Sequence, residues 1–388
     1  MRIIIFLVLI LFGIISCEQG KKNVDWENIS IKVSYNANLI PSGEKLSFDI
    51  DSKTINRSIC MIPYVAPDSS EYLFYLNGQG NDIYVFSLDS GKVVKTIKLD
   101  NQGPNGVGSM VRGFEVLTLN SLLITSAFRR KLYLVNSDAK LLSTIDYSKY
   151  KQDHDNHIHA GITWTFSNQR IGFKDGLIYL PFNPGYDEGN YQTVLPENIR
   201  MIAVLDTINK TAGTLNIGFP KDFWQNQFYP VFFGFFIYNG TFFINYCYDN
   251  RVLVSKNSQD WNSYVIQSKF VDVKNVIPSE RGEGANYCRL VADPYRDIFY
   301  RFVIHEQTGL KNRTTLDMIR HPKNFSIIIL DSNFNIIGET LFPPDTYDAH
   351  GYFITKDGLY LSLSNPYNPE YNIDKLEFKL FKLKQNEK

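Results

Sequence analysis

Residues 72–97 read YLFYLNGQGNDIYVFSLDSGKVVKTI. Two runs rich in Tyr, Phe, Ile and Val are separated by Asn and Gly, and an Asp-Ser-Gly turn leads into a third run. Short runs of this composition, bounded by turn residues, are typical of β-strands joined by tight turns. The stretch therefore predicts three consecutive antiparallel strands.

The same unit recurs along the whole chain. Its second run ends in Asp or Asn at 83–89, 131–136, 201–206 and 326–331. Six units of blade size, with little helical periodicity after the first residues, predict an all-β fold, a six-bladed β-propeller. With one marker in the first run of each unit, the steps are 50, 55, 65, 56 and 61 residues between Leu73, Leu123, Ile178, Phe243, Phe299 and Tyr360.

The two ends of the chain predict how the ring closes. The last unit ends with a third strand at 376–384 and has no outer strand, whereas the early segment Ile29–Leu39 is strand-like and otherwise unassigned. Because an unpaired strand edge is a liability, we expect the N-terminal strand to complete the last blade. This predicts one domain over residues 28–388. A pair of β-sandwiches and a seven-bladed ring with one degenerate unit remain open as alternatives.

The stretch Asp82–Gly108 resembles the first blade of TolB-like six-bladed propeller lipoproteins. It has an Asp-Ser-Gly turn, a strand, and then the run Asn-Gln-Gly-Pro-Asn-Gly at 101–106. In that group a Gly-x-Gly-Pro-Gly-like run follows the first blade, and the run here departs from it. The resemblance implies the propeller fold, and it implies no activity because the group is largely of unknown function.

The N-terminus has the form of an export signal. Met1-Arg2 precedes an apolar run over residues 3–15, which marks a secretory signal and is too short to span a membrane. The run ends in Ile-Ile-Ser-Cys at 14–17, which resembles the bacterial lipobox and implies removal of residues 1–16 and acylation of Cys17. Residues 17–27 would then be a tether. An Asp after the cysteine resembles an inner-membrane retention signal, and this chain has Glu18 there instead, which implies the outer membrane. The alternative is an ordinary signal peptide with a chance cysteine.

Composition excludes some partners. With 40 basic and 40 acidic residues, the chain offers no electrostatic case for binding nucleic acid. After Cys17 the cysteines are Cys60, Cys247 and Cys288, an odd number at wide spacing that matches neither a disulfide framework nor a zinc pattern. We expect them to be small buried hydrophobic residues, and one bridge among them stays open.

Propeller topology predicts where a ligand binds. The loops from one outer strand to the next inner strand open on the same face as the loops between second and third strands, so their polar residues converge near the channel. Aromatic and amide side chains on such a face can bind a peptide, protein or glycan. The candidates for this face are Gln102, Arg112, His154, His157, Trp224, Tyr229, Arg281, Glu283, Asn286, Asp348 and His350.

Three imidazoles lie close together in the sequence. His154, His157 and His159 could bind a transition metal, but their spacing matches no zinc signature, and the alternative is a solvated polar loop. We expect no cofactor. Glu280 and Glu283 beside Arg281 could serve as general acid and base, or form a surface ion-pair loop.

No sequence motif indicates catalysis. The chain lacks a Gly-x-Ser-x-Gly elbow, a phosphate-binding Gly-rich loop and a His-Glu-x-x-His pair. We therefore favour an envelope-anchored binding or scaffold protein held to the membrane by lipid. A propeller hydrolase or lyase acting on a glycan or lactone, metal-assisted through the histidine loop, is the alternative, and a sensor role is a third.

The stretch Ser255–Trp261 is similar to the Asp-box turn of sialidase-type propellers, although it is one residue short and lacks the glycine. In that family the box is a structural turn away from the active site.

Overall fold

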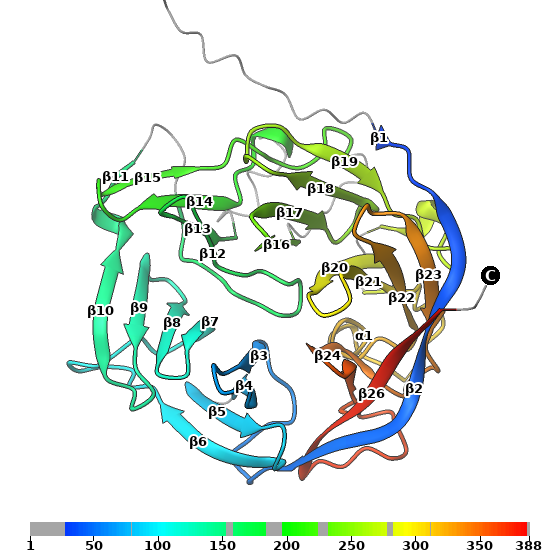
Figure 1. Cartoon of the computed structure of the whole chain (residues 1–388), viewed down its shortest axis with the longest axis horizontal. Helices are drawn as coiled ribbons and strands as arrows, with labels where there is room; N and C mark the ends of the chain where they lie inside the picture. Colours follow the sequence, from blue (N-terminus) through cyan, green and yellow to red (C-terminus); the bar gives the residue numbers. More distant parts are fainter. Residues whose placement is uncertain are drawn as a thin grey trace, which may run out of the picture.

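The computed structural model describes residues 28–78, 80–152, 158–183, 196–223, 232–277, 282–310 and 312–385. Its strands surround a central axis as a ring of sheets (Figure 1). Within the described residues there is one α-helix, α1 (Thr315–Arg320), and the short 3-10 helices are η1 (Tyr147–Lys149), η2 (Pro196–Asn198) and η3 (Val273–Asn275). The predicted all-β, propeller-like arrangement is confirmed.

Two four-stranded antiparallel sheets come first along the chain. Each begins with an inner strand, and the following strands lie progressively farther from the axis (Figure 1). The first contains β3 (Met61–Val65), β4 (Glu71–Leu76), β5 (Asp82–Ser87) and β6 (Lys92–Lys98). The second contains β7 (Val111–Thr118), β8 (Ser121–Ser126), β9 (Lys131–Val135) and β10 (Leu141–Asp146).

The next two sheets each gain a fifth, two-residue strand at the outer edge, paired in parallel. The third sheet contains β12 (Gly172–Lys174), β13 (Leu177–Pro181), β14 (Ile202–Asp206), β15 (Thr211–Thr214) and the added β11 (Lys151–Gln152). The fourth contains β16 (Phe233–Tyr238), β17 (Thr241–Tyr246), β18 (Arg251–Ser255), β19 (Asn262–Val265) and the added β1 (Asn28–Ile29).

The remaining strands form one eight-stranded sheet. Its order is β20-β21-β22-β23-β2-β26-β25-β24. The prediction of six blades therefore does not appear as six separate sheets, because β2 forms hydrogen bonds with strands on both of its sides and joins them. The bounds are β2 (Val33–Asp49), β20 (Asn286–Asp293), β21 (Ile298–Ile304), β22 (Phe325–Asp331), β23 (Ile336–Leu341), β24 (Asp348–Thr355), β25 (Gly358–Ser362) and β26 (Lys375–Gln385).

The N-terminal strand pairs with the C-terminal strand, as expected from the missing outer strand of the last unit. β2 is parallel to β23 near Val33 and antiparallel to β26 from Ala37 to Asp49. It extends ten residues past the predicted end at Leu39, because a register shift between Pro41 and Lys45 absorbs the Pro-Ser-Gly stretch that reads as a turn.

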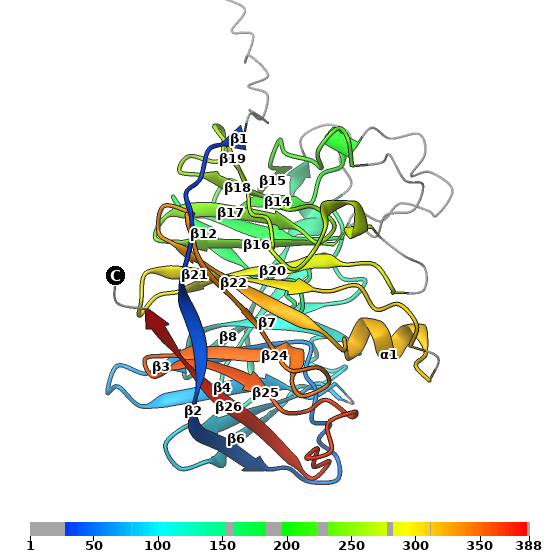
Figure 2. The same cartoon turned by 90° about the vertical axis from the view of Figure 1, so that its right-hand side faces the viewer.

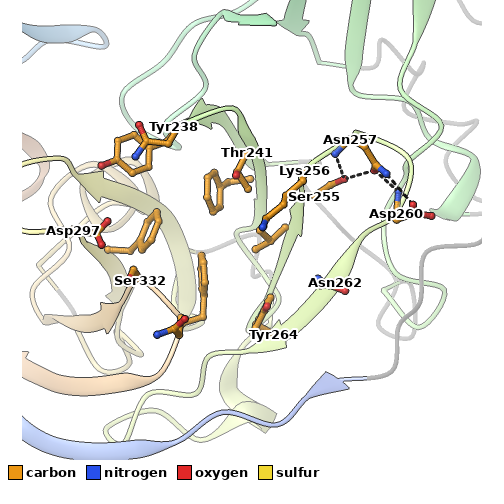
Figure 3. Close-up of a pocket in the computed structure, with 16 residues that line it drawn as sticks. Tyr238, Thr241, Ser255, Lys256, Asn257, Asp260, Asn262, Tyr264, Asp297 and Ser332 are labelled. Atoms are coloured by element: carbon orange, nitrogen blue, oxygen red, sulfur yellow. Dashed lines mark hydrogen bonds between the residues drawn. The ribbon is translucent and has the colours of Figure 1, made fainter. Parts of the chain in front are cut away.

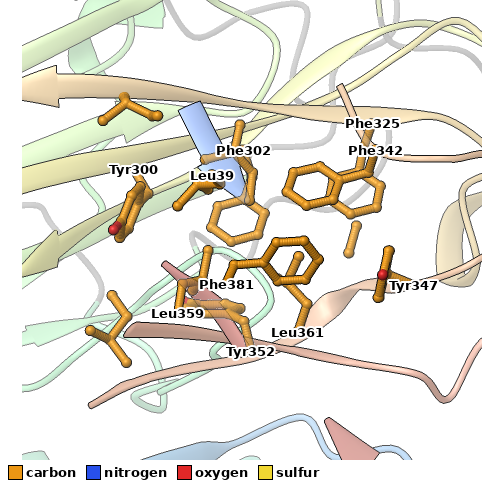
Figure 4. Close-up of a cluster of buried hydrophobic side chains, with 14 of the residues drawn as sticks. Leu39, Tyr300, Phe302, Phe325, Phe342, Tyr347, Tyr352, Leu359, Leu361 and Phe381 are labelled. Carbon is orange, nitrogen blue, oxygen red and sulfur yellow. The ribbon is translucent and has the colours of Figure 1, made fainter. Parts of the chain in front are cut away.

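Side chains from β2 fill the space between the two halves of this sheet. Leu39 is 3% exposed and belongs to a core cluster with Phe302 of β21 and Phe381 of β26 (Figure 4). Aromatic pairs hold the cluster together, since the ring of Phe342 lies 5.2 Å from that of Phe381 and 4.8 Å from that of Phe325. The closure thus depends on apolar packing as well as on strand pairing.

The centre of the ring is occupied by the segment of residues 161–170, which we call the central segment. In Figure 1 the green loop preceding β12 extends to the middle of the ring. Its hydrogen bonds reach the second, third, fourth and eight-stranded sheets and Ile59, two residues before β3 of the first sheet, so it links repeats that are far apart in sequence. They join Ile162 to Pro181, Thr163 to Thr125, Thr165 to Ile59 and Tyr352, and Asn168 to Phe235 and Leu290.

The two faces of the ring differ. The inner strands β3, β7, β16, β20 and β24 all begin on one face, which we call the loop face, and α1 projects from it (Figure 2). The opposite face carries the tight hairpin turns that join first to second and third to fourth strands, and we call it the turn face. The topology on which the predicted binding face depends is therefore present.

Candidate functional site

We call the end of the ring's central axis on the loop face the mouth. It contains Asp348 and His350, two of the predicted face residues. Both begin β24 and are buried, at 2% and 4% exposure. The backbone N–H of His350 donates to Asp348 Oδ1 over 2.9 Å, and its Nε2 donates to the carbonyl oxygen of Ile319 in α1 over 3.0 Å. The last turn of α1 therefore lies directly beside the mouth.

Arg289 of β20 lies next to His350 and is completely buried. Its guanidinium donates to Ala349 O over 2.7 Å and to His350 Nδ1 over 2.5 Å, so the imidazole proton is on Nε2. The guanidinium carbon lies 4.8 Å from the ring centre of Phe302 and 5.0 Å from that of Tyr352, within cation–π range. Among the described residues, no carboxylate pairs with Arg289, and its buried Nε has no hydrogen-bond partner.

Further cations surround the same mouth. Arg57, just before β3, approaches Asp348 to 4.0 Å and keeps 26% of its side chain exposed. Burial lowers the pKa of Arg57, and the charges of Arg320 and Arg289 act in the same direction, whereas Asp348 opposes them. Three arginines thus share a region with two carboxylates, Asp348 and Asp317 of α1. The mouth carries an excess of positive charge.

The central segment forms an aromatic floor under these charges. Phe166 is half-buried and stacks on His350, with ring centres 4.1 Å apart at 23°. Trp164, two residues earlier and also half-buried, has the guanidinium of Arg112 over its ring at 5.7 Å. The predicted face residue Arg112 therefore contacts the central segment, two residues from Phe166 at the mouth.

Electrostatics keep the imidazole of His350 neutral. Burial, together with the positive charges of Arg289 and Arg57, holds its pKa well below the ordinary value of 6.5. Burial also lowers the pKa of His321, which follows α1, although the charge of Asp348 opposes this. Neutral imidazoles act here as hydrogen-bond partners rather than as charges, so the arginines supply the positive field.

For three other predicted face residues we find no hydrogen bond or ring contact to this cluster among the described residues. Gln102 is exposed in the turn before β7. Glu283 is half-buried, and its backbone carbonyl accepts from Gln307 N over 2.8 Å. Asn286 is half-buried at the start of β20, paired with Ile304. The remaining predicted positions lie outside the described residues: Cys17, His154, His157, Trp224, Tyr229 and Arg281.

Nothing in the described chain gathers metal ligands. No group of three His, Cys, Asp or Glu side chains with metal-binding geometry occurs in the ranges given above. His159, the described member of the predicted trio, has its ring 6.1 Å from Phe182. Cys60, Cys247 and Cys288 are free and buried, as expected. The same ranges contain no helix long and apolar enough to cross a membrane.

Five residues of the mouth do not follow from the sequence patterns. Arg57 precedes the first predicted unit, Arg320 lies on a helix that the strand repeats do not predict, and Trp164 and Phe166 lie in a stretch without strand periodicity. Arg289 interrupts the apolar strand Asn286–Asp293, and a charge inside a predicted inner strand was the signal that could have identified it.

The fold and the mouth define a propeller-like all-β protein with a polar, cationic cluster of side chains on its loop face. The family model described as "Domain of unknown function (DUF4221)" matches residues 36–341, and the chain belongs to this family. A crystal structure of a DUF4221 family member from Bacteroides vulgatus is similar over 91% of this chain and 99% of that chain, with a TM-score of 0.77 and 24% identity. A "Putative exported protein" from Bacteroides fragilis is similar over 93% of this chain and 98% of its own, with a TM-score of 0.52 and 12% identity. No curated protein matches the chain.

Proposed function

We propose that this protein is an exported, lipid-anchored recognition module whose mouth binds an anionic segment of a peptide or protein partner. One observation carries the proposal: Arg57, Arg289 and Arg320 gather beside the aromatic side chains of the central segment and outnumber the carboxylates near them, Asp348 and Asp317. An anionic group would balance the excess charge in a partly desolvated site, where each charge-assisted hydrogen bond is strong.

Exposed apolar side chains on the same face favour a protein or peptide as the partner. Phe128, in the β8–β9 turn, is 90% exposed, and Leu316 and Ile319 of α1 are 50% and 42% exposed. Aromatic and aliphatic anchors beside arginines are typical of protein interfaces. The mouth would hold the charged group, and these side chains would contact the flanking residues.

The export signal and Cys17 support the anchor. The Bacteroides fragilis protein of similar fold is named as exported, which agrees with a location outside the cytoplasm. Acylation of Cys17 would hold the protein in the envelope, and Glu18 favours the outer membrane. Asn28 pairs with Ser263, next to the turn face, so the tether would leave from the side away from the mouth. The loop face would then point away from the bilayer.

A six-bladed propeller of the TolB-like kind is the architecture that we propose beneath this site. β20 to β23 would be one blade, and β24 to β26 with β2 the other, within the eight-stranded sheet. Their shared edge at β2 would be the closure of the ring, and six inner strands would converge on one mouth.

Binding of acidic and basic peptides of equal length to the purified protein tests the proposal. We expect the acidic peptides to bind, with an affinity that falls as salt rises, and Arg320→Ala and Arg57→Ala to weaken binding about tenfold. Arg320 is exposed, so its variant keeps the fold, whereas Arg57→Ala also uncovers Asp348. Lys140→Ala, an exposed cation on the turn face, is the control. Equal binding of both peptides, or equal effects of Arg320→Ala and Lys140→Ala, would show that the mouth does not recognise anions.

A further inference from the structure

A second concave site lies on the turn face, away from the mouth. It is a groove of about 510 Å³ between the hairpin turns of the fourth sheet and the β20–β21 and β22–β23 turns of the eight-stranded sheet. In Figure 3 the side chains of Tyr238, Asp297 and Ser332 border it on one side, and those of Lys256 and Tyr264 on the other. Its volume suits a ligand of two or three sugar rings better than a folded partner.

The floor of the groove is aromatic. Phe334 stacks on Phe299 with ring centres 4.8 Å apart, and Phe243 lies 5.8 Å from Phe334. All three are nearly fully buried and belong to one core cluster. Tyr264 stacks on Phe334 at 5.0 Å and is only half-buried, so its ring extends the floor toward solvent.

The rim of the groove presents polar groups. The hydroxyls of Tyr238 and Tyr264 and the side-chain amide of Asn262 line it, and none of the three has a hydrogen bond to any described residue. Burial alone raises the pKa of Tyr264, which keeps its hydroxyl protonated as a donor. The two tyrosines are half-buried and Asn262 is exposed, and hydroxyls and amides without an internal partner are suited to a ligand that both donates and accepts.

The wall that carries Asn262 is preorganised by the turn that is similar to the Asp-box. Asn257 Oδ1 accepts from the backbone N–H groups of Gln259 and Asp260 over 3.0 and 2.9 Å. Trp261 is 4% exposed and donates from Nε1 to Ser258 O. A rigid wall lowers the ordering cost of binding. The motif is thus a structural turn, and it borders a groove.

The charges of the groove point to a neutral ligand. Lys256 faces the groove with Asp260 and Asp297, so the lining has no excess of positive charge with which to hold a phosphate or carboxylate. A continuous apolar surface that would suit an acyl chain is also absent from the lining, because amides and hydroxyls alternate with the rings. A saccharide combines an apolar ring face with polar edges, and both match this lining.

We propose that this groove binds a neutral oligosaccharide, with the rings of Tyr264 and Tyr238 against sugar faces and Asn262 hydrogen-bonded to hydroxyls. The proposal is independent of the anionic partner at the mouth, since the two sites lie on opposite faces. The protein would then hold a glycan and a protein segment at the same time.

Calorimetric titration and saturation-transfer NMR of the full protein with maltotriose, cellotriose, chitotriose and anionic sialyllactose test the proposal. We expect a neutral trisaccharide to bind with a Kd of about 1 mM or tighter. Asn262→Ala and Tyr238→Phe, which removes only a hydroxyl, should each weaken that binding at least fivefold. Gln102→Ala, an exposed amide on the loop face, is the control and should leave it unchanged.

Arg57→Ala separates the two sites. Neutral saccharide binding should persist in that variant, even if the mouth fails to bind acidic peptides. The proposal is overturned if no neutral member binds, if Asn262→Ala behaves like Gln102→Ala, or if only sialyllactose binds and Arg57→Ala abolishes its binding.

Discussion

Replacing Leu39 with alanine tests how the ring is closed. Leu39 of β2 is 3% exposed within the core cluster between β21 and β26, and Leu39→Ala removes three buried carbon atoms. At about 0.8 kcal/mol per buried methylene the transfer term is about 2.4 kcal/mol, and the remaining cavity raises the loss of unfolding free energy to about 3–4 kcal/mol. Ile40, the next residue of the same strand, is 41% exposed, so Ile40→Ala should cost less than about 1 kcal/mol.

Thermal and guanidinium unfolding of the two variants measure the difference. With an unfolding entropy of about 2.1 cal/mol/K per residue and about 360 folded residues, a loss of 3–4 kcal/mol corresponds to a Tm lowered by roughly 5 °C. Ile40→Ala should shift the Tm by about 1 °C at most. Equal shifts for the two variants would refute the claim that β2 closes the ring by packing into this cluster.

Two more predictions concern the mouth and the central segment. The pKa of His350 lies well below its unfolded value near 6.5, so as the pH drops below 6.5 the unfolded chain takes up a proton first and the folded state loses stability. Denaturant unfolding at pH 7, 6 and 5 should show a loss of unfolding free energy of up to about 2 kcal/mol from this group. His350→Asn should flatten the dependence of the unfolding free energy on pH. If the unfolding free energy of His350→Asn depends on pH as strongly as that of the unmodified protein, the assignment to His350 is wrong. The second prediction concerns Gly113 of β7. It has a φ of 147°, and a Cβ there would lie 1.9 Å from Thr163 O, so Gly113→Ala should lower the unfolding free energy by about 3 kcal/mol. Gly213→Ala, where a Cβ meets nothing within 4 Å, is the control, and a Gly113→Ala variant as stable as that control would mean that the central segment is not held against β7.

The strands could be predicted from the sequence because their signals are local. Runs such as 201–206 and 326–331 end in Asp, and that Asp accepts hydrogen bonds from the following turn. Asp206 accepts from the backbone of Ile208 and Asn209, and Asp331 from that of Asn333 and Asn335. The closing strand was also predictable, because the last unit lacked an outer strand. Its full length was not, since Pro41-Ser42-Gly43 has the composition of a turn and is absorbed as a bulge within β2.

The mouth was only partly predictable. Asp348 and His350 were identified because propeller topology assigns the start of each inner strand to one face. The central segment was not foreseen, since its partners come from every repeat and no local pattern records such distant contacts. Arg289 was missed for a related reason: its partners, Ala349 and His350, lie about 60 residues away in the chain.

Photo-crosslinking in cells is the most direct test of the central claim that the loop face binds a protein segment through its cationic mouth. A photoreactive amino acid replaces either Phe128, which is 90% exposed on the loop face, or Ile208, which is 82% exposed on the turn face. The account predicts a discrete adduct from position 128, lost when Arg57→Ala is added, and none from position 208. Adducts of equal yield from both positions, or an adduct from position 128 that is insensitive to Arg57→Ala, would contradict it.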